Sequence, residues 1–113
     1  EAAGALSLET VVEGDLERAV TGGYCGDLLS WVMGRAPADS LWITVMGNVN
    51  AVAVAVLADV AAILLAEDSP LDEAAREKAE AQGVTVLRSP LPAYELAVRL
   101  SEWLRARQRQ SPL

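Results

Sequence analysis

The stretch TGGYCGD, which begins at Thr21, stands directly before apolar residues at helical spacing. A glycine-rich turn that leads into a helix is the usual shape of a phosphate-binding loop, because backbone N–H groups at a helix start attract anions. The dinucleotide-binding pattern is incomplete here, since Thr21 replaces its first glycine, and the chain's single lysine, Lys78, lies too far away for a Walker loop. Asp27 would repel a phosphate and is expected to cap the following helix.

We therefore expect this glycine turn mainly to redirect the chain, at positive φ and with close backbone approach. Contact of its backbone, at Gly22 and Gly23, with a ligand is the alternative interpretation.

Residue types that commonly carry catalysis are scarce. The chain has no histidine, which excludes imidazole as a base or metal ligand. Cys25 is the single cysteine, so neither a disulfide framework nor a thiolate zinc cluster can form, and a reducing, cytoplasmic location is expected. Asp59, Glu67 and Asp68 are acids of the kind found in magnesium or phosphoacceptor sites, but the lysine that a receiver domain needs is missing. We expect no catalytic residue, no metal and no cofactor.

Net charge and the composition of one apolar segment exclude some classes of partner and location. The 113 residues carry a net charge of −7, which argues against nucleic acid or an anionic membrane as a partner. The apolar residues 49–66 contain Asn50 and Asp59 and lack basic or aromatic anchors, so we do not expect a membrane span.

Apolar runs alternate with amphipathic segments along the chain. Expected strands are residues 6–12, 41–45, 61–65 and 84–87, and residues 16–21 are expected to form a short strand or an extended arm. Expected helices are residues 28–33, 50–58, 69–82 and 92–105. This alternation predicts a single α/β domain over residues 1–107, with a mostly parallel sheet and helices on both faces. Residues 108–113 are expected to form a frayed tail.

Polar residues follow several of the predicted strands, at the edge where open α/β sheets bind ligands. The expected ligand-binding residues are Gly22, Gly23, Asn48, Asn50, Asp68 and Ser89. Ordinary helix capping is the alternative interpretation for the polar members of this set.

Three blocks carry a resemblance to a known family: VTGGYCGDLLSWVMG, LWITVMGNVNAVAVAVLADVAAILL and LRSPLPAYELAVRL. Together they resemble the DRTGG domain, which is similar in fold to the N-terminal domain of HPr kinase/phosphorylase. Thr21, Gly22 and Gly23 match the end of the name-giving motif, whereas Ala19 and Val20 replace its Asp-Arg pair. The resemblance implies a non-catalytic α/β module that regulates or oligomerises, without kinase activity.

The predicted helix 50–58 is apolar all round, although one sheet can cover only one side of it. A homodimer would cover the other side, with Trp31, Val52, Val54 and Val56 as expected interface residues. Burial as the central helix of a monomer is the alternative. We thus expect a regulatory module that senses a small ligand, such as a nucleotide, and self-associates. The alternative is an enzyme subunit whose active site is completed across a dimer interface.

Overall fold

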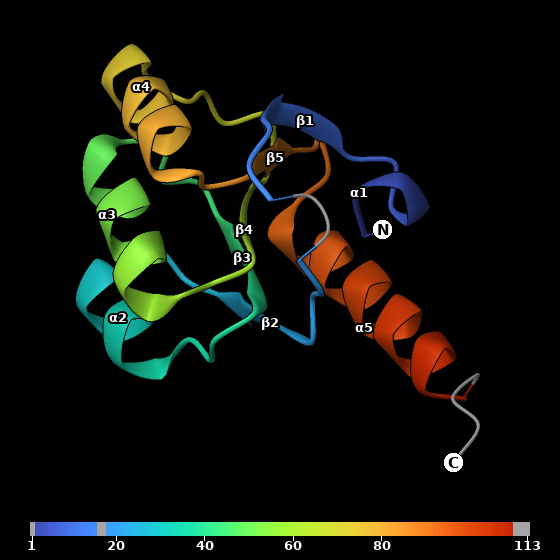
Figure 1. The fold of residues 1–113 in the computed structure, drawn as a ribbon. Coiled ribbons are helices and arrows are strands. Elements are labelled where there is room, and N and C mark those ends of the chain that lie inside the picture. Colours follow the sequence, from blue (N-terminus) through green and yellow to red (C-terminus); the bar gives the residue numbers. More distant parts are fainter. Residues whose placement is uncertain (1, 16–17, 110–113) are drawn as a thin grey trace.

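The computed structural model describes residues 2–15 and 18–109, built around a five-stranded sheet of order β1-β5-β4-β3-β2 (Figure 1). Its strands are β1 (Glu9–Val12), β2 (Gly22–Cys25), β3 (Ser40–Thr44), β4 (Ala62–Leu65) and β5 (Val86–Arg88). Strands β2 to β5 are parallel, and β1 is antiparallel to β5. The predicted compact α/β domain with a mostly parallel sheet is confirmed.

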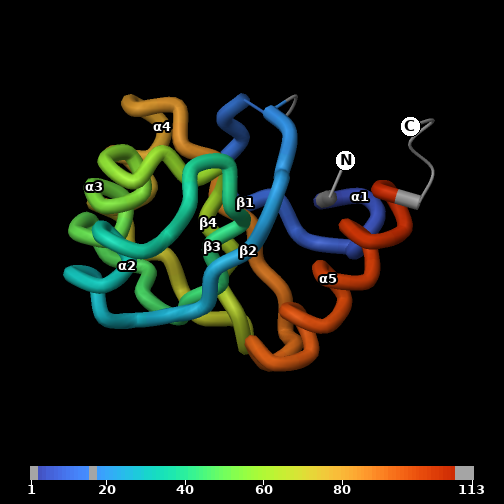
Figure 2. Tube along the Cα trace, turned by 90° about the horizontal axis from the view of Figure 1, so that it is seen from below, coloured from blue at the N-terminus to red at the C-terminus, as the bar shows by residue number. Residues whose placement is uncertain are grey.

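The helices form two layers around the sheet. They are α1 (Ala2–Ala5), α2 (Leu29–Arg35), α3 (Val49–Ala58), α4 (Glu73–Gln82) and α5 (Ala93–Arg109). Figures 1 and 2 show α2, α3 and α4 together on one side, and α5 with the short α1 on the other.

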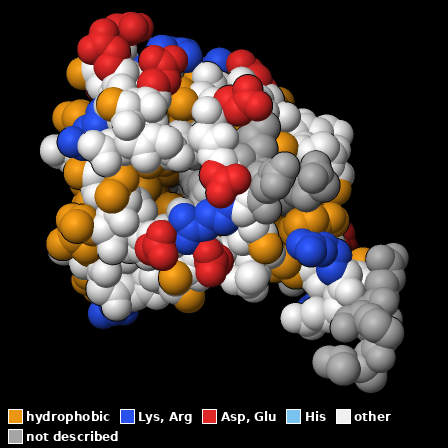
Figure 3. Space-filling view, in the orientation of Figure 1, with side chains coloured by type: hydrophobic (Ala, Val, Ile, Leu, Met, Phe, Trp, Pro, Cys, Tyr) orange, Lys and Arg blue, Asp and Glu red, His pale blue; other side chains and the backbone are white. Residues whose placement is uncertain are grey.

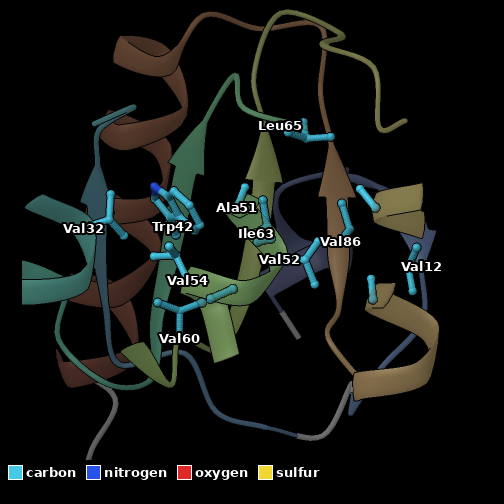
Figure 4. Packing of buried hydrophobic residues seen from close by; sticks show 13 residues of the cluster. Val12, Val32, Trp42, Ala51, Val52, Val54, Val60, Ile63, Leu65 and Val86 are labelled. Atoms are coloured by element: carbon cyan, nitrogen blue, oxygen red, sulfur yellow. The ribbon is translucent and has the colours of Figure 1, made fainter. Parts of the chain in front are cut away.

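Alternate residues of the central strands enter two separate apolar clusters, because successive side chains of a strand point to opposite faces. Trp42 and Ile63 pack with Val52 of α3 in the first cluster (Figure 4). Leu41 and Leu64 pack in the second cluster, which also receives leucines of α5. Burial from both sides explains why these strands are continuous apolar runs in the sequence.

Residues 49–58, which are mostly Ala and Val, form helix α3, and this confirms the predicted helix 50–58. The side-chain oxygen of Asn48 accepts a hydrogen bond from Ala51 N at 2.9 Å and caps α3. Helix α4 begins at Glu73, with Asp72 as its cap, and not at residue 69. Gly83 ends α4 at φ 69°, as expected.

The expectation for the glycine turn was wrong about its conformation and right about its close approach to another part of the chain. Residues 18–21 form no strand, and the strand is instead Gly22–Cys25, in the turn itself (residues 16 and 17 lie outside the described part). Gly83 is the only described glycine with positive φ, so Gly22 and Gly23 are not needed for that conformation. A close approach does exist, because a Cβ on Gly23 would lie 2.6 Å from Leu100 Cδ2 of α5.

Helix α5 continues through Arg109, so the expected tail starts within a helix, and residues 110–113 lie outside the described residues. The domain boundary at residue 107 stays a prediction.

Candidate functional site

The carboxyl ends of β2, β3, β4 and β5 lie at one edge of the sheet, because these strands are parallel. Loops that follow β4 and β5 are joined by main-chain hydrogen bonds from Glu67 N to Leu91 O at 3.0 Å and from Asp68 N to Ser89 O at 2.9 Å. The loop after β4 is also tied to the loop after β3 through Asp72 N and Gly47 O, at 2.9 Å. We call these joined loops the carboxyl edge.

Asp27, in the loop after β2, joins this loop to the end of β3, a contact that the sequence did not predict. Its Oδ1 atom accepts hydrogen bonds from Thr44 Oγ1 at 2.6 Å and from Val45 N at 3.1 Å. The residue that caps α2 is Leu28, which offers no side-chain hydrogen bond. The predicted capping role of Asp27 is therefore wrong, because the hydroxyl and amide groups of the neighbouring strand bind its carboxylate instead.

The structure brings Asn48, Asn50, Asp68 and Ser89 to the carboxyl edge, but two of them already have local partners. Asn48 caps α3, and the Ser89 hydroxyl, which is almost fully buried, accepts a hydrogen bond from Leu91 N at 3.1 Å. Asn50 and Asp68 expose their side chains to solvent. Asp68 adopts φ 56°, as does Glu67 before it, so the loop after β4 turns through two left-handed residues.

The structure does not place Gly22 and Gly23 with this group. Gly22 pairs in register with Ser40, the first residue of β3, and so lies near the amino ends of the strands. Gly23 lies against α5. The predicted six-residue site is thus divided between two separate parts of the molecule.

An ion-pair cluster closes the amino edge of the sheet. Arg18 contacts Asp39 at 2.7 Å and Asp59 at 2.9 Å, and both acids adopt left-handed backbone conformations. Burial acts to lower the pKa of Arg18, but hydrogen bonds and attraction from the two carboxylates outweigh burial and raise this pKa. Arg18 therefore forms an ion pair with each of the two acids, which favours a structural role for this cluster.

The predicted interface residues also separate into two groups. Val52 and Val54 are 0% and 8% exposed and belong to the chain's own core, so they cannot contact a partner in this conformation. Trp31 and Val56 are 52% and 42% exposed. Helix α3 is covered by the sheet and flanked by α2 and α4, as Figure 1 shows, which accounts for the burial of its inner valines.

Sequence reasoning missed further exposed apolar side chains on the same two helices. Leu57 on α3 is 72% exposed, and Leu28 at the start of α2 is 57% exposed. Figure 3 shows hydrophobic side chains gathered over α2 and α3. Leu28 and Trp31 are three residues apart, a spacing that places both on one helix face and could have identified them. We call the exposed side chains Leu28, Trp31, Val56 and Leu57 together the α2–α3 surface, although Val56 lies on the side of α3 that borders Gln82 and Gly83.

Within residues 2–15 and 18–109, no group of three or more acidic or cysteine side chains could hold a metal ion. In the same part of the chain, no helix has the length and apolar character needed to cross a membrane.

No family model and no curated protein matches the sequence. Among solved structures, the chain is similar to the CBS and DRTGG domains of the regulatory region of Clostridium perfringens pyrophosphatase, complexed with its activator diadenosine tetraphosphate. The TM-score is 0.65 at 17% sequence identity, over 88% of this chain and 43% of that chain. The likeness is one of fold. The chain spans less than half the length of that structure.

Proposed function

We propose that this chain is a non-catalytic regulatory module of the DRTGG type, related in fold to the N-terminal domain of HPr kinase/phosphorylase, which senses a small ligand and self-associates. The observation that carries this proposal is the fold shared with a regulatory region that was crystallised with a nucleotide activator. The resemblance of the three sequence blocks to the same domain type supports it independently.

The proposed ligand is a nucleotide bound at the carboxyl edge, where Asn50 and Asp68 have exposed side chains. An amide can donate to and accept from the edge of a base, and a carboxylate accepts hydrogen bonds from ribose hydroxyls. The main-chain hydrogen bonds between the loops after β4 and β5 hold the backbone of Asp68 in place before a ligand arrives, and Asn50 is held by its position in α3. Such preorganisation lowers the entropic cost of binding.

Titration calorimetry with AMP, ATP and diadenosine tetraphosphate tests this site. We expect weaker binding to Asn50→Ala and Asp68→Asn than to wild type, because each variant loses a hydrogen-bonding group. Glu80→Gln is the matched control, since it removes one exposed acid from α4, away from the edge. Absence of binding to the wild-type chain would refute the nucleotide proposal, and equal losses in all three variants would refute the site.

The proposed self-association uses the α2–α3 surface. Leu28, Trp31 and Leu57 are each more than half exposed, and exposed tryptophan is enriched at the centres of protein interfaces. The guanidinium of Arg35 stacks over the Trp31 ring, 3.9 Å from the ring centroid. A second copy that covers this surface would remove these apolar groups from water.

A turnover screen of the isolated chain with nucleotides and phosphoesters tests the non-catalytic part of the proposal. We expect no turnover above a heat-denatured control. Clear activity would instead favour an enzyme subunit whose active site is completed across the dimer interface.

A further inference from the structure

A cavity of about 380 Å³ lies between the edge strand β2 and helix α5. Small-molecule sites commonly occupy about 300–1,000 Å³. Gly23 and Cys25 line it from β2, and Leu100 and Leu104 line it from α5. Because Gly23 has no side chain, α5 packs closely against β2 at this point, and Leu100 Cδ2 lies only 2.6 Å from the place that a Cβ would take. We call this space the α5 cavity.

The polar groups of the α5 cavity come from one side of α5. Ser101, Arg105 and Gln108 line it, and its described lining residues include no acidic side chain. Among residues 2–15 and 18–109, no acid forms an ion pair with Arg105. A neighbouring hollow of about 280 Å³ shares Leu104 and Gln108 with the cavity and adds Arg107. A second hollow, of about 340 Å³, shares Arg105 with the cavity and adds one acid, Glu102.

This local positive charge stands out on a chain whose net charge is −7. A guanidinium beside an apolar wall, with no ion pair among the described residues, attracts an anion and gives it a directional hydrogen-bonding partner.

Cys25 forms part of the wall, and its thiol is not activated as a nucleophile. Burial raises the pKa of Cys25, and the negative charge of Asp27 raises it further. Although part of the residue is exposed, its sulfur is therefore a neutral thiol at neutral pH. Cys25 is also the single cysteine of the chain, so it reports directly on occupancy of the cavity.

We propose that the α5 cavity binds a small molecule with a flat apolar body and one anionic group, phosphate or carboxylate. The body lies against Leu100, Leu104 and the backbone of Gly23, and the anionic group meets Arg105. This site is separate from the carboxyl edge, which lies beyond the ends of the parallel strands. The inference therefore does not depend on the nucleotide proposal, and the two can fail independently.

Two fluorescent probes that differ by one charge test this site. Anilinonaphthalene sulfonate has a flat apolar body with an anionic group, and phenylnaphthylamine is the same body without the anion. We expect Arg105→Glu to weaken sulfonate binding by at least about tenfold, because it removes one charge-assisted contact and adds a carboxylate that repels the anion, and to leave binding of the neutral probe unchanged. Arg99→Glu is the matched control, because Arg99 is exposed on the same helix and lies outside the cavity lining.

Alkylation of Cys25 by N-ethylmaleimide locates the probe. We expect the sulfonate probe to slow alkylation of the wild-type chain, and expect Ala97→Phe, which fills the cavity, to abolish both binding and protection. Competition by naphthyl phosphate and by naphthoate identifies the preferred anionic group. The proposal is overturned if Arg105→Glu and Arg99→Glu weaken sulfonate binding equally, if bound probe leaves the alkylation rate unchanged, or if neither competitor displaces it.

Discussion

Replacement of Asn48 by alanine separates a capping role from a ligand-binding role at the carboxyl edge. In the folded chain Asn48 Oδ1 accepts a hydrogen bond from Ala51 N at 2.9 Å, and Ala51 is fully buried. Without the side chain, this N–H keeps only the main-chain contact to Asn48 O at 3.1 Å. Loss of an N-cap costs about 0.5–2 kcal/mol, and the remaining contact places the expected loss near the middle, at about 1 kcal/mol.

The assay is thermal and urea unfolding followed by far-ultraviolet circular dichroism. A loss of about 1 kcal/mol lowers Tm by about 4 °C in a domain of this size. Asn48→Asp keeps the acceptor and adds a negative charge at the start of α3, so its stability should equal or exceed that of wild type. Asn50→Ala is the neighbouring control, because the Asn50 side chain is exposed. The capping assignment is refuted if Asn48→Ala costs no more than Asn50→Ala, or if Asn48→Asp costs as much as Asn48→Ala.

Three further outcomes are expected from single changes. Trp42→Phe should lower the free energy of unfolding by about 1–2 kcal/mol in urea unfolding, because Trp42 Nε1 donates to Gly26 O at 2.9 Å in a fully buried position. Gly83→Ala should cost about 1 kcal/mol in the same assay, since Gly83 adopts φ 69°, and Gly83→Asn should cost less. The pH–rate profile for alkylation of Cys25 should have its midpoint above that of a free cysteine peptide, because burial and Asp27 raise the pKa of the thiol, and Asp27→Asn should move the midpoint down.

The central part of the fold was predictable because its signals are local. Residues 41–45, 61–65 and 84–87 are short apolar runs between polar segments, and each overlaps a parallel strand. Residues 51–58 are mostly alternating Ala and Val, so their periodicity does not distinguish a helix from a strand. An asparagine before them and an aspartate after them favour a helix, and Asn48 and Asp59 are the two caps of α3 in the structure.

The strand at Gly22–Cys25 was not predicted, because its formation depends on distant residues. Gly22–Cys25 becomes a strand through pairing with β3 and close packing against Leu100 on α5, which the local sequence cannot show. Asp27 before an apolar run matches a capping pattern, yet Thr44 provides a competing hydrogen bond from another strand.

The candidate site was predictable only as far as topology determines it. Parallel strands bring Asn48, Asp68 and Ser89 to one edge wherever their side chains point. Gly22 was expected there because the preceding strand was placed at residues 16–21, and moving the strand to Gly22–Cys25 places this glycine near the opposite edge.

The mass of the chain in solution tests the proposed self-association most directly. Light scattering at micromolar concentration should give twice the chain mass for wild type and one chain mass for Val56→Glu and Leu57→Glu, with unchanged circular dichroism. Ala81→Glu, which adds the same charge to an exposed position of α4, should remain a dimer. A wild-type mass of one chain, or variants of Val56 and Leu57 that remain dimeric, would contradict self-association through the α2–α3 surface.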